Sequence, residues 1–528
     1  MSILTIRFAI FLSVAIVLYY LTPAAHQWKS LLLISCGFYL VSGPENLIFL
    51  LTTALSTYYA GIRIGRINDE YEEKLALCRE AGTKLTRAEK QALKAEEDKR
   101  KRVIMVLTLV LNYGILFVLK YSDTLRFLIP FSYQVPAFSW IIPMGISYYT
   151  FQSMGYIIDL YRRKYPPERN VFRLMLFVSF FPQLIQGPIS RFDELGKTLY
   201  QPHGFAFHNI KYGVELMAWG MFKKLVISDR IAIMTNTIFG APERYRGVYL
   251  AVATVLSMLQ LYTDFSGGID MVRGAGELFG ITLAENFTRP FFAVNLGEYW
   301  RRWHITLNNW WRDYIFYPLT LSKVFTGFGK KAKKLVGDNF GKKLPILLSV
   351  IIIRVINSIW HGATVTSILG GIYYGLLLAL SFYFEPYFKL ANEKLRINTE
   401  CFSWKLYQCV RTFVLIAAPR LVSRASTMRE SAVYMKCLVS TYNPWILFDG
   451  SLYNLGVSQK QFLVLMISLV LLLVVSAIQE RGIVVREALD RQNVVFRIAF
   501  YCIFIYAIVL FGVYGQGYDA SSFTYAQF

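Results

Sequence analysis

The amino-acid sequence predicts an all-α protein that crosses a membrane many times. Of its 528 residues, 55% are hydrophobic and 16% are aromatic, and the mean hydropathy is +0.40, which is too apolar for an ordinary soluble protein. Many apolar runs approach the roughly 20 residues that a helix needs to cross a bilayer. We therefore expect a polytopic bundle of about ten or more transmembrane helices together with re-entrant helices.

The strong positive charge does not indicate a nucleic-acid-binding protein. The formal net charge is +22, but the lysines and arginines fall mostly in loops between apolar runs. This placement fits the positive-inside rule and an anionic inner leaflet, so we expect contact with membrane lipid and none with nucleic acid. The six cysteines are scattered without metal-ligand spacing, which predicts free thiols, no structural disulfide and no metal site.

Two apolar runs have distinctive features. The first, Ile3 to Leu21, lacks a basic cluster before it and a small-residue cleavage site after it, so we expect it to remain as the first membrane helix. The run Leu174 to Ile189 contains Pro182 and Gly187-Pro188, which predicts a bent or re-entrant segment. The remaining apolar runs are Leu31–Val41, Leu47–Ile62, Val103–Leu119, Phe138–Tyr161, Leu216–Ile227, Val248–Tyr262, Leu344–Ile353, Ile368–Phe384, Trp404–Leu415, Phe462–Val475 and Val494–Val513.

Two charged segments interrupt what otherwise reads as one integral-membrane domain over residues 1–528. Residues 67–102 mix Glu, Lys, Arg and Ala at helical spacing, which predicts a cytoplasmic helical hairpin that turns at Gly82-Thr83. Lys323 to Lys343 reads as a basic cytoplasmic loop that attracts anionic lipid or an acidic donor protein. A short polar tail, residues 515–528, ends the chain.

His361 is the candidate catalytic residue. It lies between apolar runs, where a titratable ring is costly and marks function by default. Imidazole exchanges a proton near neutral pH, and the small neighbours Gly362 and Ala363 leave room for a substrate, so His361 is a candidate general base. The alternative is a histidine that only hydrogen-bonds neighbouring helices.

A second cluster, Glu298 to His304, interleaves arginine with tryptophan. Such residues suit a membrane interface, where indole lies at headgroup level and guanidinium reaches water or phosphate. The functional alternative is that the arginines attract an anionic donor and that His304 guards a channel towards His361. The residues assigned to donor binding or to the channel are Arg301, Arg302, Trp303, Trp360, Asn357, Asp264 and Gln186.

Asp264 and Asp270 follow another apolar run. Two carboxylates there invite a metal, but a third ligand with regular spacing is missing. The favoured interpretation is that these aspartates orient a histidine or pair with Arg273.

Seven motifs, in a fixed order, connect the chain to a known family. They are Pro143–Gln152, Phe181–Ile189, Phe222–Lys224, Asp264–Gly267, Asn286–Phe287, Tyr299–His304 and Trp360–Ala363. With these motifs the chain resembles the membrane-bound O-acyltransferases, in particular the bacterial branch that serves alginate O-acetylation and teichoic-acid D-alanylation. The resemblance implies a helical bundle around a central tunnel, with His361 as the catalytic histidine and His304 as a supporting one.

The last six residues have the form Phe523-x-Tyr525-x-x-Phe528. They resemble a terminal motif of these systems in which the tyrosine hydroxyl is thought to hold the acyl group in transit. By this resemblance Tyr525 is a third catalytic residue, and His361 acts as its base, because a phenol has a pKa of about 10 and benefits from base assistance. The alternative is a tail that only packs on the outer surface.

The resemblance implies an enzyme that moves an acyl group, acetyl rather than D-alanyl, across a bacterial plasma membrane. The donor would be a cytoplasmic thioester, on coenzyme A or on the phosphopantetheine of an acyl carrier protein, with no bound cofactor. A separate extracytoplasmic acyltransferase would then acylate a cell-surface or exported polysaccharide. Two other classes remain open: a transporter or flippase for an acyl or glycan intermediate, and an O-acyltransferase acting on lipid or protein.

Overall fold

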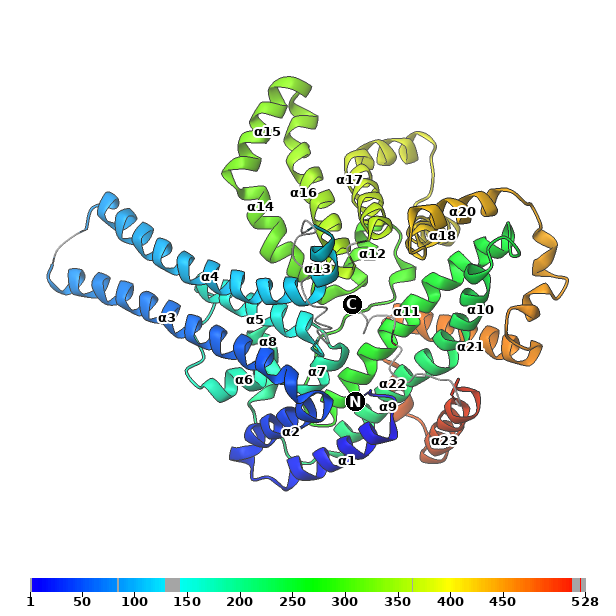
Figure 1. The fold of residues 1–528 in the computed structure, drawn as a ribbon, viewed down its shortest axis with the longest axis horizontal. Helices are drawn as coiled ribbons and strands as arrows, with labels where there is room; N and C mark the ends of the chain where they lie inside the picture. Colours follow the sequence, from blue (N-terminus) through cyan, green and yellow to red (C-terminus); the bar gives the residue numbers. More distant parts are fainter. Residues whose placement is uncertain (1, 83–84, 129–142, 363, 515–522, 524–528) are drawn as a thin grey trace. The chain divides into compact units, whose positions relative to one another are not determined.

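The computed structural model describes residues 2–82, 85–128, 143–362, 364–514 and 523, and this part of the chain is helical (Figure 1). Within it the one β-type contact is an isolated antiparallel bridge between Phe287 and Trp303. The all-α prediction is therefore confirmed. The chain divides into two compact units, which are described separately: Met1–Val214 with Val272–Ala284, and Glu215–Met271 with Glu285–Phe528.

The first unit contains short and long helices with defined starts. Thr5 caps α1 by accepting a hydrogen bond from the Phe8 amide, and the Asn170 side chain caps α6 in the same way. The helices are α1 (Ile6–Leu21), η1 (Ala24–His26), α2 (Gln27–Ser42), η2 (Pro44–Asn46), α3 (Leu47–Glu80), α4 (Arg87–Leu128), α5 (Ile146–Tyr161), α6 (Val171–Ser179), α7 (Phe181–Gln186), α8 (Phe192–Leu199) and α9 (Phe207–Met221) as far as Val214.

The predicted bend in the run Leu174 to Ile189 is confirmed. Helix α6 ends at Ser179, Phe180 leaves the helical conformation with ψ 109°, and α7 continues with Pro182 in its first turn. Proline is tolerated there because the first amides of a helix have no intrahelical acceptor.

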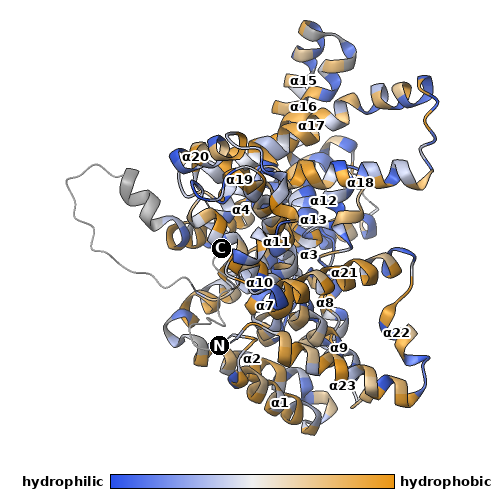
Figure 2. Ribbon diagram, turned by 90° about the vertical axis from the view of Figure 1, so that its right-hand side faces the viewer, coloured by the Kyte–Doolittle hydropathy of each residue, from blue (hydrophilic) through white to orange (hydrophobic). Residues whose placement is uncertain are grey.

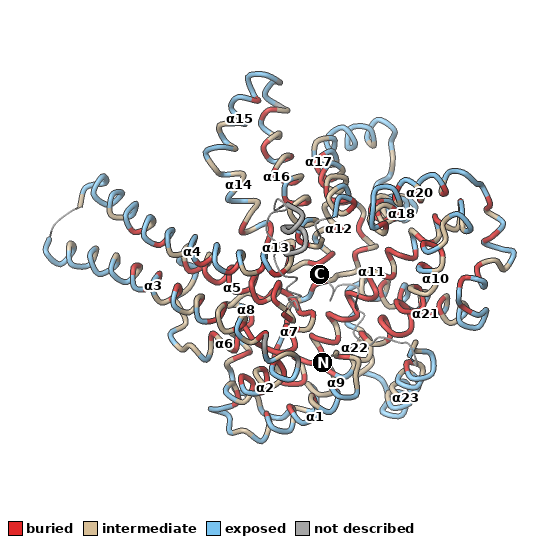
Figure 3. The backbone as a smooth tube through the Cα atoms, in the orientation of Figure 1, coloured by how far each residue is buried: buried red, intermediate tan, exposed pale blue. Residues whose placement is uncertain are grey.

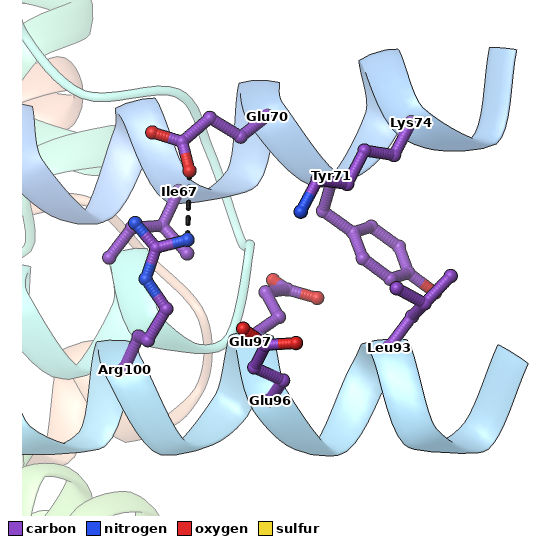
Figure 4. A pocket seen from close by; sticks show the side chains of 8 residues that line it. All are labelled: Ile67, Glu70, Tyr71, Lys74, Leu93, Glu96, Glu97 and Arg100. Carbon is purple, nitrogen blue, oxygen red and sulfur yellow. Dashed lines mark hydrogen bonds and ion pairs between the residues drawn. The ribbon is translucent and has the colours of Figure 1, made fainter. Parts of the chain in front are cut away.

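Helices α3 and α4 lie side by side as a long antiparallel pair, and their far halves are exposed (Figures 1 and 3). The charged residues 67–102 form the outer ends of both helices, since α3 runs from Leu47 to Glu80 and α4 begins at Arg87, and Thr83 of the predicted turn lies outside the described residues. Arg163 joins the pair by ion pairs to Glu97 at 2.6 Å and to Glu72 at 2.5 Å. A small pocket lies between the helices, and Arg100 crosses it to Glu70 at 2.8 Å (Figure 4).

The second unit carries most of the motifs that point to function. Helices α9 and α11 link the two units, since each crosses a boundary between them. The unit contains η3 (Phe222–Ser228), α10 (Asp229–Gly240), α11 (Val248–Glu277), η4 (Pro290–Phe292), α12 (Leu296–Arg302), α13 (Ile305–Trp311), η5 (Arg312–Phe316), α14 (Tyr317–Leu321), α15 (Lys323–Val336), α16 (Asp338–His361), α17 (Val365–Lys394), α18 (Phe402–Ala417), α19 (Arg420–Ser423), α20 (Met428–Val439), η6 (Pro444–Leu447), η7 (Ser451–Asn454), α21 (Gln459–Glu480), α22 (Val485–Asp490) and α23 (Val494–Phe511).

Seven helices of the described part of the chain are long and apolar enough to cross a membrane. They are α3, α4 as far as Tyr121, α11, α16 from Phe340, α17, α21 and α23. Two apolar stretches are shorter, Ile6–Leu21 and Val171–Gln186. Helices α21 and α23 are apolar over most of their length (Figure 2). The protein is therefore a multi-pass membrane protein.

The segment from Lys323 to Lys343 is helical, and the prediction of a loop there was wrong. Ser322 caps α15 by accepting from the Phe325 amide at 3.3 Å. Ala332 is buried, and α15 packs along α16 at Gly341, where an added Cβ would lie 2.4 Å from the Lys333 backbone. Packing of these small residues outweighs the charge density that suggested a loop.

We expect Arg163→Ala to lower the thermal midpoint of the purified protein by several degrees. The variant leaves Glu97, whose side chain is 4% exposed, with Lys101 as its remaining ion-pair partner among the described residues. Leaving a buried charge less well paired costs about 1 to 3 kcal/mol. Arg79→Ala, which changes an exposed arginine of α3, is the matched control. Equal midpoints for the two variants would show that Arg163 does not stabilise the pair.

Candidate active site

Asn286 organises the segment that carries His304. Its side-chain oxygen accepts hydrogen bonds from the amide and hydroxyl of Thr306 at 2.9 and 2.8 Å, and lies 3.4 Å from Nδ1 of His304. Its backbone oxygen accepts from the Ile305 amide at 3.0 Å. Because an amide oxygen only accepts, the contact with the imidazole favours the tautomer protonated on Nδ1. The buried Asn286 side chain thus fixes both the first turn of α13 and the orientation of the His304 ring.

His304 is buried and its backbone is strained. It is 2% exposed, has φ 45° and ψ 54°, and meets the edge of Phe265 at 4.8 Å between ring centroids. A side chain with Cβ rarely adopts this left-handed conformation, and such strain is typical of functional positions. His304 lies outside the candidate spans, and burial lowers its pKa to about 3. The imidazole is therefore neutral at physiological pH.

Arg302 is held in a network of carboxylates. Its guanidinium pairs with Glu298 at 2.6 Å and with Glu480 at 2.8 Å, and Arg289 also reaches Glu480 at 2.6 Å. This network ties α12 to the end of α21. Arg301, the other arginine of the cluster, is exposed. A role of these two residues in donor binding stays a prediction.

Trp303 belongs to an aromatic wall next to His304. It is buried, stacks on Tyr299 at 5.6 Å and meets Phe287 edge-on at 5.0 Å. Aromatic pairs of this geometry add about 0.5 to 1.5 kcal/mol beyond simple burial. The wall therefore holds the turn between α12 and α13 in one conformation.

His361 is the last residue of α16 and is half-buried, with its ring edge-on to Trp360 at 4.4 Å. A Cβ added to the next residue, Gly362, would meet no described atom within 4 Å, so this position of the chain is open. Ala363 lies outside the described residues. One turn earlier, Asn357 accepts a hydrogen bond from the Trp311 indole at 3.0 Å. This bond joins α16, which ends on His361, to α13, which begins directly after His304.

Asp264 is part of a buried ion-pair cluster. Lys224 reaches Asp264 at 2.7 Å and Asp229 at 2.8 Å, while Lys223 reaches Asp270 at 2.7 Å. The lysines belong to η3, a π-helical segment whose residues are all buried. Among the residues that the structure describes, no group of three His, Cys, Asp or Glu is arranged to hold a metal ion. The geometry assigns Asp264 a role in charge pairing.

Gln186 belongs to the first unit and is 1% exposed at the end of α7. Neither its amide nitrogen nor its amide oxygen has a hydrogen-bond partner among the described residues. A buried amide in this condition is expensive, because it has given up its hydrogen bonds to water. Tyr525 lies outside the described residues.

Sequence reasoning missed the role of three residues around these side chains. Asn286 and Lys224 were noted only as parts of motifs, and their partners lie 20 and 40 positions away. Glu480 gave no signal, because it follows an apolar run like many other helix ends. Only the folded chain brings it to Arg302.

The comparison with known proteins identifies the class. Residues 167–416 match the family model described as the membrane-bound O-acyltransferase family, MBOAT. This part of the chain is therefore an MBOAT family domain. The match includes both histidines and all of the network around them except Glu480.

Individual relatives agree with the family. The probable alginate O-acetylase AlgI of Azotobacter vinelandii is 28% identical over 447 residues, which are 83% of this chain and 78% of that protein. The peptidoglycan O-acetyltransferase of Helicobacter pylori is 30% identical over 308 residues, 53% of this chain and 55% of its own length. The teichoic acid D-alanyltransferase of Bacillus subtilis is 28% identical over 265 residues, 48% of this chain and 62% of that protein. The chain thus covers less than two thirds of the last two proteins.

We expect His304→Gln to flatten the dependence of stability on pH. In the unfolded chain His304 binds a proton below its ordinary pKa of about 6.5, whereas the folded protein resists protonation down to about 3. The wild-type protein should therefore lose about 1.4 kcal/mol more per pH unit than the variant as the pH falls from 6.5 to 4. Thermal midpoints of the wild-type protein and of His304→Gln, measured across this pH range, test the expectation. Parallel curves would contradict a neutral, buried His304.

Proposed function

We propose that the protein is an O-acyltransferase of the bacterial plasma membrane that moves an acetyl group from a cytoplasmic thioester to a cell-surface or exported polysaccharide. The observation that carries the proposal is the half-buried His361 at the end of α16, with free space at Gly362 and a hydrogen-bonded link to the helix that begins after His304. The relatives are named for O-acetylation of alginate or peptidoglycan and for D-alanylation of teichoic acid, and these names support the proposal.

The two histidines have different roles in this proposal. His361 is partly accessible and serves as the general base, since imidazole accepts a proton near neutral pH. His304 is neutral and fully surrounded by protein, so it acts through hydrogen bonds and orients a substrate group. The strain at His304 and the support from Asn286 fit a preorganised orientation.

The donor is a thioester on coenzyme A or on an acyl carrier protein, both of which are anionic. Helix α15 offers five lysines and no acidic residue, and four of those lysines, Lys330, Lys331, Lys333 and Lys334, are exposed within its second half. Such a surface speeds the encounter with an anionic partner. Anionic membrane lipid is attracted by the same charge.

The tail is the proposed acceptor on the opposite side. Its described residue, Phe523, is 3% exposed, and the Lys224 ammonium lies 4.8 Å from its ring centroid. A cation over an aromatic face is a favourable contact in a desolvated site. The contact supports a tail that docks in the second unit, with Tyr525 two positions further along the chain.

The reaction is then an acyl transfer in balanced steps. His361 takes the proton of the Tyr525 hydroxyl while the phenolic oxygen attacks the thioester carbonyl, the carbon–sulfur bond breaks, and the thiolate leaves with the proton from His361. A separate extracytoplasmic acyltransferase receives the acetyl group from Tyr525 and passes it to the polysaccharide.

Mass spectrometry of the carboxyl-terminal peptide tests the proposal. Membranes that contain the wild-type protein receive an isotope-labelled acetyl donor, and we expect an acetyl mass on Tyr525. The mass should vanish in Tyr525→Phe and fall by at least about 100-fold in His361→Ala, because general-base assistance contributes about 10² to 10⁴. Two exposed residues supply matched controls, His208→Ala and Tyr442→Phe.

Other outcomes separate the alternatives. Polysaccharide acetylation without an acetyl mass on Tyr525 would remove the tail from the mechanism. Acetylation that survives His361→Ala would contradict catalysis by this chain and favour a transporter or flippase. Acetyl ester on a purified lipid or protein, with none on the polysaccharide, would identify a different acceptor.

The link between α13 and α16 gives a further prediction. Trp311→Phe keeps an aromatic side chain, smaller than indole, but removes the indole N–H that binds Asn357. Loss of one such bond between uncharged groups costs about 1 kcal/mol, so we expect acyl transfer to Tyr525 to slow about fivefold with normal expression. Trp445→Phe, at an exposed tryptophan, is the control. An unchanged rate in Trp311→Phe would show that the link does not position His361.

A further inference from the structure

Arg354 is a buried cation in a candidate membrane span. It belongs to α16, within the apolar stretch Phe340–His361, and is 9% exposed. An arginine in such a position is expensive unless it is paired, hydrogen-bonded or open to water. The residues around Arg354 must therefore account for the burial of this cation.

The other deeply buried cations of the second unit show how the protein meets this cost. Lys223 and Lys224 pair with aspartates, and Arg230 donates to the backbone oxygens of Val226 and Phe511. In the described part of the chain, the Arg354 guanidinium has neither an ion pair nor a hydrogen bond. It has an aromatic neighbour instead, since its central carbon lies 3.8 Å from the centroid of the Trp300 ring.

Stacking on Trp300 uses the flat face of the guanidinium. Its five N–H donors lie in the plane of the group and point away from the ring, so they stay available to a planar or tetrahedral anion. Trp300 is itself fixed edge-on against Tyr374 at 5.3 Å, and the Tyr374 hydroxyl donates to the Ile416 oxygen at 2.8 Å. The cation is therefore held in place without being neutralised.

Close helix packing fixes the backbone at the same point. Helix α17 runs beside α16 (Figure 1). A Cβ added to Gly371 would lie 2.8 Å from the Arg354 carbonyl oxygen, and one added to Gly375 would lie 3.4 Å from the Arg354 Cβ. Glycines let two helices approach this closely. The position of the guanidinium is thus set by rigid elements.

Arg354 and His361 are seven residues apart on one helix. Seven residues are about two turns, so the two side chains share a face and their Cα atoms are separated by about 10 Å along the axis. Towards the other end of α16, Lys342 and Lys343 lie in the first two turns of the same helix. A ligand that extends along this face can therefore present an anionic group to Arg354 and a reacting group to His361.

We propose that Arg354 and the face of Trp300 form a binding site for a phosphate ester, which in the reaction is the phosphate of the phosphopantetheine arm of the acyl donor. The inference rests on the proposed function, because it names the part of the donor that this chain recognises. Arg354 is then a binding residue that sets donor specificity.

The test compares three donors that differ in phosphate: acetyl-pantetheine, acetyl-phosphopantetheine and acetyl-coenzyme A. For the purified wild-type protein in nanodiscs, we expect the KM for acetyl-phosphopantetheine to be about 10- to 100-fold below that for acetyl-pantetheine, the range of one or two charge-assisted hydrogen bonds. In Arg354→Gln this ratio should collapse to within about threefold. Arg354→Lys should retain part of it, and Arg429→Gln, an exposed arginine of α20, should retain all of it.

Direct binding of radiolabelled phosphopantetheine distinguishes this inference from the proposed function. Binding that is lost in Arg354→Gln and retained in Arg429→Gln supports the site even if no donor supports acyl transfer, in which case the proposed function fails alone. Acyl transfer without any preference for the phosphorylated donor in the wild-type protein overturns the inference and leaves the proposed function intact. This wild-type comparison decides the matter if Arg354→Gln does not fold.

A phospholipid headgroup could supply the same phosphate chemistry. Native mass spectrometry of protein from nanodiscs of phosphatidylcholine, with and without phosphatidylglycerol, detects it. A retained phosphatidylglycerol that disappears in Arg354→Gln, with donor preference unchanged, would identify the lipid as the ligand and overturn the assignment to the donor. A folded Arg354→Gln that alters neither donor preference nor lipid retention would show that the stacked pair is structural only.

Discussion

The structure depends on the cost of placing charge in an apolar chain. Moving an ion out of water costs several kcal/mol, and a buried charge persists when an opposite charge and hydrogen bonds repay that cost. Lys224 meets two aspartates, and neighbouring Lys223 meets a third. Consecutive residues on an α-helix point about 100° apart, yet both lysines reach carboxylates of α11. The π-helical segment that carries them therefore has a fixed register against α11.

The free-energy cost of burying a charge also distinguishes the two histidines. At His304, burial stabilises the neutral imidazole, so the ring can orient a substrate but cannot hold a proton at neutral pH. His361 ends its helix half-buried, next to the open position of Gly362. One histidine is preorganised and the other is accessible. A base must be accessible to the proton that it removes, and this difference supports the assignment of the base to His361.

Sequence patterns that act over a few residues predicted much of the fold. They could not predict which residues far apart in the chain would pair. The bend at Phe180 followed from Pro182, and the spans followed from apolar runs, because both features act within a few residues. The pairing of Arg302 with Glu480 spans 178 positions and depends on which helices pack together. Helix α15 was misread because lysine density suggested a loop, whereas the small residues that pack on α16 carry little weight in a local pattern.

Arg354 differs from the other buried cations in a way that bears on mechanism. For Lys224 the protein supplies the compensating charge itself, and the result is a permanent structural pair. For Arg354 it supplies an aromatic face, which stabilises a cation by about 2 kcal/mol when desolvated and leaves the N–H groups free to bind. An anion that binds Arg354 gains the ion-pair energy that a carboxylate of the protein would have in the same place. On the proposal that Arg354 binds the phosphate of the donor, a charge pair that stays open until the donor arrives lets the chain hold the donor near His361 and then release it.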